Sequence, residues 1–86
     1  SSFSLVLVEN QEMIYLYESG KLRYGDISVD IESSETLISF ISSQIPKSEL
    51  ITLAIEKRAY HEWVLQLMDD LQLSGYQNIQ IRTYQE

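Results

Sequence analysis

The most regular pattern of apolar and polar positions runs from Tyr60 to Ile81 and predicts a helix followed by a strand. The apolar residues of this helix fall on one arc, roughly 140° wide at 100° per residue. They are Tyr60, Trp63, Val64, Leu67, Met68 and Leu71. Gly75 suits the left-handed C′ position that ends a helix, and in that register Tyr76 is expected to pack on Leu71.

Two apolar segments flank this helix and complete a strand–helix–strand unit. Leu50 to Glu56 is an apolar run bounded by charge, which indicates a buried, central strand. After the helix, Ile79 and Ile81 alternate with polar residues, so one face of this strand is expected on the core and the other toward solvent or a partner. Because the joints are short, the unit predicts a crossover between two parallel strands.

The first half of the chain predicts further strands. Phe3 to Val8 and Met13 to Tyr17 are rich in strand formers and are separated by a polar turn, so they predict a hairpin. Within the second strand, Tyr15 and Tyr17 share one face. Ile27 to Val29 predicts a short edge strand.

A second amphipathic helix is predicted before the central strand and ends near Gln44. Ser33 or Ser34 is a suitable N-cap, and Ile45 ends the helix because a residue before proline avoids the helical region. Its apolar arc contains Leu37, Ile38, Phe40, Ile41 and Ile45. Each helix has one apolar arc, so both can cover the same face of one sheet.

These elements predict one α+β domain over residues 1–86. The expected fold has two layers, with two helices on one face of a mixed sheet of four to five strands in the order β-β-(β)-α-β-α-β. A chain of 86 residues buries only a modest core, so a dimer would add buried surface. The absence of cysteine excludes disulfides and thiolate metal sites.

The charge of the chain bears on its partners. Thirteen acidic and six basic residues give a net charge of −7, which argues against nucleic acid or an anionic membrane surface as the main partner. A basic protein partner fits better, although an acidic surface is also common on any soluble protein.

No residue pattern argues for catalysis, a cofactor or a metal. His61 is the only histidine, and without a second ligand it is interpreted as a partly exposed structural residue. Asp69 and Asp70 diverge by about 100° on a helix and cannot share a proton. Lys57 and Arg58 follow the predicted central strand, on the usual ligand side of α/β sheets, but no glycine-rich phosphate loop accompanies them.

One ordered set of residues carries a resemblance to a known family. In chain order it is Tyr60, Val64-Leu65, Leu67-Met68-Asp69, Leu71, Gly75-Tyr76, Ile79 and Ile81. It resembles the C-terminal half of the periplasmic domain of the ExbD/TolR family of biopolymer transport proteins, and the earlier chain is compatible with that domain. At the end of the central strand the family has Asp after Ala, five residues before the Tyr. Here Glu56 follows Ile55 and stands four residues before Tyr60, so no role of that acidic residue is carried over.

The resemblance implies a protein-interaction domain and not an enzyme. It would lie at the periplasmic face of the Gram-negative inner membrane, in a protein with a single membrane anchor outside these residues. The implied partners are a second copy in a homodimer, an ExbB/TolQ-like membrane protein, a TonB- or TolA-like protein energised by the proton-motive force, and peptidoglycan. No cofactor or metal is implied.

The last strand is the expected partner-binding or dimer edge, because it ends the chain and alternates apolar and polar residues. Its residues are Asn78, Ile79, Gln80, Ile81, Arg82, Thr83 and Tyr84. The net charge favours a basic extended peptide there. Tyr17, Lys57 and Arg58 are a candidate secondary contact. The alternative is a small α/β ligand-binding domain or enzyme that uses the Lys57-Arg58 loop.

Overall fold

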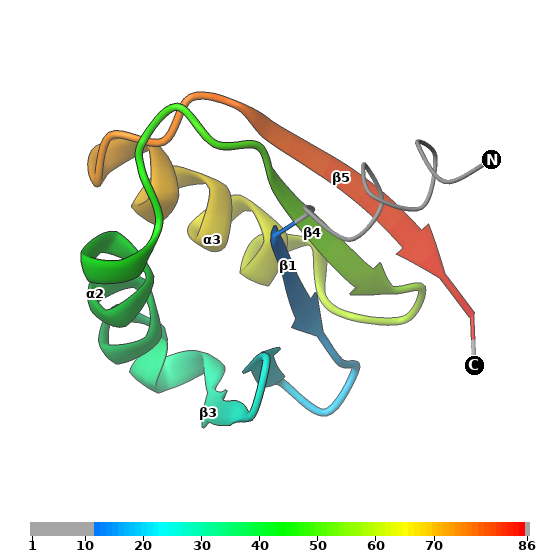
Figure 1. The fold of residues 1–86 in the computed structure, drawn as a ribbon. Coiled ribbons are helices and arrows are strands. Elements are labelled where there is room, and N and C mark those ends of the chain that lie inside the picture. Colours follow the sequence, from blue (N-terminus) through cyan, green and yellow to red (C-terminus); the bar gives the residue numbers. More distant parts are fainter. Residues whose placement is uncertain (1–11, 86) are drawn as a thin grey trace, which may run out of the picture.

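The computed structural model describes residues 12–85 and contains two α-helices, one short 3₁₀ helix and a mixed five-stranded sheet (Figure 1). The strands are β1 (Glu12–Leu16), β2 (Lys21–Tyr24), β3 (Ile27–Asp30), β4 (Ile51–Glu56) and β5 (Ile79–Tyr84). The helices are the 3₁₀ helix η1 (Ile31–Ser33), α2 (Ser34–Gln44) and α3 (His61–Leu73). The predicted α+β class with both α-helices on one face of the sheet is confirmed.

The strands lie in the order β3-β2-β1-β4-β5. The pairs β1–β2 and β2–β3 are antiparallel, whereas β1–β4 and β4–β5 are parallel. The predicted crossover through α3 between parallel strands is therefore confirmed. β1 lies between β2 and β4, so both of its edges are occupied, and its hairpin partner is β2 and not the segment 3–8 that was predicted. The strand predicted at residues 3–8 lies outside the described residues.

The core lies between the sheet and the two helices, which cover the same face (Figure 1). Ile14 and Leu16 of β1 are buried on that face, and Tyr15 lies on the other, as the alternation predicts. The other buried members of the cluster come from β2, β4, the helices and the segments that follow the helices: Leu22, Ile31, Leu37, Ile38, Ile41, Ile45, Ile51, Leu53, Ile55, Val64, Leu67, Leu71 and Tyr76.

Two aromatic residues assigned to the helix arcs are more exposed than predicted. Tyr60 is 59% exposed, because it is the N-cap of α3 with extended backbone (φ −64°, ψ 135°) and lies outside the helix. Its ring packs on Trp63, with 4.5 Å between the centroids. Phe40 is 39% exposed at the margin of the arc of α2, where its ring approaches Tyr24 at 6.4 Å.

The predicted side-chain cap of α2 is also absent. Ser33 occupies the N-cap position without a side-chain hydrogen bond to the helix. Ser34 is buried, and its hydroxyl accepts a hydrogen bond of 3.3 Å from Nε2 of Gln66 on α3. The serine therefore connects the two helices instead of capping one of them.

The end of α3 follows the prediction closely. Gly75 has φ 107°, its N–H donates to the Gln72 carbonyl at 3.0 Å, and the Tyr76 N–H donates to the Leu71 carbonyl at 3.0 Å. These two bonds define a Schellman motif. The buried Tyr76 hydroxyl donates to the carbonyls of Ile41 and Ile45, which fastens the end of α3 to the end of α2.

A partly buried hydrogen bond predicts how stability depends on pH. The Tyr24 hydroxyl donates to Oε1 of Glu12 at 2.6 Å, and burial together with this bond raises the pKa of Tyr24 to about 12. The pKa of Tyr24 in the folded protein lies above its unfolded value of about 10. The contribution of this hydrogen bond to the free energy of unfolding is therefore fully present below pH ~10 and is lost as pH rises through ~12. In urea melts across this range, the wild type is expected to lose more unfolding free energy than Tyr24→Phe. Parallel losses in the two proteins would contradict the prediction.

Candidate interaction surface

Strand β5 ends the sheet on one side, and no strand within residues 12–85 pairs with its outer edge. The ladder to β4 begins where the Ile51 N–H donates to the Asn78 carbonyl and ends where the Lys57 N–H donates to the Tyr84 carbonyl, both at 2.8 Å. Hydrogen bonding alternates along a parallel strand, so the even-numbered residues of β5 bond to β4. The N–H and C=O groups of Ile79, Ile81 and Thr83 therefore face the outer edge.

An apolar groove lies beside this edge, on the helix side of the sheet. Its volume is about 360 Å³. The apolar lining residues are Ile55, Ala59, Val64 and Ile81, and the polar ones are Lys57, His61 and Thr83. Ile81 is 43% exposed, because the first turns of α3 leave this part of β5 uncovered. The sequence alone does not reveal the groove, because apart from Ile81 and Thr83 its lining residues belong to other segments.

The predicted edge residues divide into two kinds. Asn78 precedes β5, and its side-chain amide donates to the Ser48 carbonyl at 2.9 Å, so it holds the loop that enters β4. The remaining residues form β5 itself. Gln80 and Arg82 lie on the face opposite the helices, and Ile81 and Thr83 lie on the helix side.

A tyrosine cluster covers part of the opposite face of the sheet. Tyr15 stacks on Tyr17 at 6.3 Å and meets the edge of Tyr84 at 6.2 Å. The Arg23 guanidinium lies 4.4 Å from the Tyr15 ring centroid, and its Nε donates to the Tyr17 hydroxyl at 2.9 Å. That hydrogen bond raises the pKa of Arg23. Tyr17 and Tyr84, which were predicted at separate contacts, thus belong to one cluster. Arg23 contacts two of its tyrosines, although no pattern in the sequence singled out this residue.

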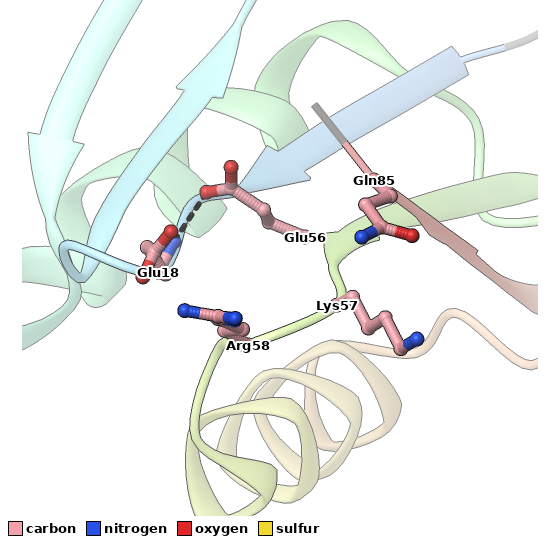
Figure 2. A pocket seen from close by; sticks show the side chains of 5 residues that line it. All are labelled: Glu18, Glu56, Lys57, Arg58 and Gln85. Atoms are coloured by element: carbon pink, nitrogen blue, oxygen red, sulfur yellow. Dashed lines mark hydrogen bonds between the residues drawn. The ribbon is translucent and has the colours of Figure 1, made fainter.

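Lys57 and Arg58 line a hollow of about 250 Å³ at the carboxyl end of the parallel strands. The other lining residues are Glu18, Glu56 and Gln85 (Figure 2). Oε1 of Glu56 accepts the Glu18 N–H at 2.7 Å. Figure 2 shows Arg58 directed toward Glu18 and Lys57 pointing away. Two carboxylates balance two cations, so the lining does not favour an anionic ligand.

Two further features bear on function. Among residues 12–85, no group of three or more His, Asp or Glu side chains could hold a metal ion. In the same part of the chain, no helix is long and apolar enough to cross a membrane.

No protein-family model matches the chain, and no curated protein matches it. The fold and the surface define a class of domain: a two-layer α+β domain with an exposed edge strand beside an apolar groove.

Proposed function

We propose that this chain is a protein-interaction domain that binds an extended segment of a partner protein by strand addition at β5. The observation that carries the proposal is the coincidence of two features on one edge. The backbone groups of Ile79, Ile81 and Thr83 face outward, and the groove beside them can receive alternate side chains of an added strand.

We further propose that the domain belongs to a stator complex of the inner membrane, at its periplasmic face, and that the added segment comes from a TonB- or TolA-like protein. Support comes from the resemblance to the ExbD/TolR family, which ends in a strand–helix–strand unit with a Gly-Tyr pair after the helix. The order of elements from β2 to β5 is compatible with that domain. The proposal includes an ExbB/TolQ-like membrane partner and a homodimer.

The edge proposal predicts that Thr83→Pro weakens binding by about tenfold or more, because an outward N–H is replaced by a ring that cannot donate. The probe is a set of overlapping peptides from the extracytoplasmic part of a TonB- or TolA-like protein of the same organism. Amide shifts in the isotope-labelled 86-residue chain report binding. Thr83→Ala is the matched control, since it changes the side chain and keeps the N–H.

Proline at Gln80 or Arg82 would not test the outer edge, because the N–H groups of these residues point to β4. Their loss would break the hydrogen-bond ladder between β4 and β5. Unchanged circular dichroism and melting of Thr83→Pro exclude global unfolding. Shifts confined to residues 57–60 would contradict the edge proposal and favour the Lys57-Arg58 loop. Concentration-dependent shifts of Ile81 and Thr83 without peptide would identify a second copy as the occupant.

A further inference from the structure

The charged side chains along β5 differ from the acidic average of the chain, although Glu18 and Glu56 line the hollow at its carboxyl end. The sequence has 13 acidic and six basic residues, yet neither of the two hollows along β5 is lined by a carboxylate, and both are lined by Lys57. Glu56 lies opposite Tyr84 in the register, and one of its oxygens accepts the Glu18 N–H. The net charge of −7 therefore does not describe this edge.

A strand added to β5 would place its side chains in two rows. One row lies on the helix side, next to Ile81 and Thr83, and enters the groove with Val64 at its base. Because Ile81 is partly exposed there, apolar side chains in this row remove apolar surface of both partners from water.

The other row lies next to Gln80 and Arg82. In the orientation of the Gln80 amide that satisfies both its oxygen and its nitrogen, the oxygen accepts a hydrogen bond of 2.8 Å from Nε of Arg82. The part of the chain described by the structure has no carboxylate within ion-pair distance of Arg82. An exposed guanidinium that has no ion-pair partner among residues 12–85 favours a carboxylate from outside.

We infer that the β5 edge selects an extended partner segment in which β-branched apolar residues alternate with Asp or Glu. The inference rests on strand addition at β5 and names the chemistry of the partner. The apolar residues occupy the groove, and the acidic residues face Arg82, with Lys57 at the end of the strand adding to the attraction. The basic segment expected from the net charge would instead place like charges beside Arg82.

Three capped synthetic peptides test the inference: GTVEVEVTG, GTVKVKVTG and GTSESESTG. Each is titrated into the labelled 86-residue chain at low salt, and Kd is taken from the amide shifts of β5.

The glutamate–valine peptide is expected to bind about tenfold more tightly than the lysine–valine peptide. The difference should shrink with added salt. It should also reverse in Arg82→Glu, and Arg82→Gln should leave the two valine peptides closer to equal. The glutamate–serine peptide should bind more weakly than the glutamate–valine peptide, because it leaves the groove empty.

The outcomes separate this inference from strand addition itself. A preference for the glutamate–valine peptide that is lost in Thr83→Pro supports both. If the lysine–valine peptide binds equally well or better, and Thr83→Pro abolishes that binding, the partner chemistry is wrong and strand addition stands. If none of the peptides binds, or binding is insensitive to Thr83→Pro, the inference is overturned. Peptides of a TonB- or TolA-like protein then decide separately whether strand addition survives.

Discussion

Replacing Tyr76 with alanine is expected to lower the free energy of unfolding by about 3–5 kcal/mol. Tyr76 is the largest fully buried side chain among residues 12–85, and it lies where the C-terminal ends of α2 and α3 meet. Its hydroxyl donates to the carbonyls of Ile41 and Ile45, and Nζ of Lys47 lies 4.4 Å from the ring centroid. Truncation therefore opens a cavity and also leaves buried carbonyl groups with fewer partners. In a small domain, a loss of this size is a large part of the total stability, which is typically about 5–15 kcal/mol.

Urea unfolding followed by circular dichroism measures this effect, and Tyr76→Phe divides it into two parts. The phenylalanine variant keeps the ring and removes the hydroxyl, so a loss of about 1–3 kcal/mol is expected. The phenol of Tyr76 is protonated and able to donate at neutral pH, and burial raises its pKa further. If Tyr76→Phe is as stable as the wild type, the hydrogen bonds of the Tyr76 hydroxyl to the Ile41 and Ile45 carbonyls contribute no net stability.

A second large effect is expected from Leu67→Ala, which should destabilise the domain by about 2–5 kcal/mol. Leu67 is 0% exposed at the centre of the face that α3 turns to the sheet. Leu65→Ala is a matched control on the same helix, because Leu65 is 53% exposed. Its replacement should change the unfolding free energy by less than ~0.5 kcal/mol, as expected for a surface position. Equal losses for the two variants in urea melts would mean that the buried face of α3 is wrongly assigned.

The helices and their ends were predictable because their causes are local. The arc that contains Val64, Leu67 and Leu71 follows from helical spacing and is buried as expected. Gly75 ends α3 because the backbone at the end of this helix needs a positive φ. Tyr60 was assigned wrongly, since periodicity continues through a cap position and does not reveal which residue has the first helical backbone angles.

The strands were predictable only in part. The alternation in β1 and the apolar run in β4 appear in the sequence, and both strands lie inside the sheet. β2 was not identified, because it has four residues and only Leu22 is fully buried. The antiparallel pairing of β2 with β1 and β3 stabilises this short strand, and that contribution is not visible in its own pattern.

The sequence by itself determined the two helix faces, the turn at Gly75 and the parallel strand–helix–strand unit, because spacing and backbone preference within a few residues specify them. The sequence also predicted the last strand as an edge. Only the tertiary structure decided that a groove lies next to β5, that Ile81 and Thr83 present the outward N–H groups, and that no carboxylate of residues 12–85 lies within ion-pair distance of Arg82. These properties depend on the strand order, on which alternate residues of β5 direct their backbone groups to β4, and on which distant side chains become neighbours. A net charge summed over the chain carries none of that information, because electrostatic attraction at a surface is set by the charges nearest to it.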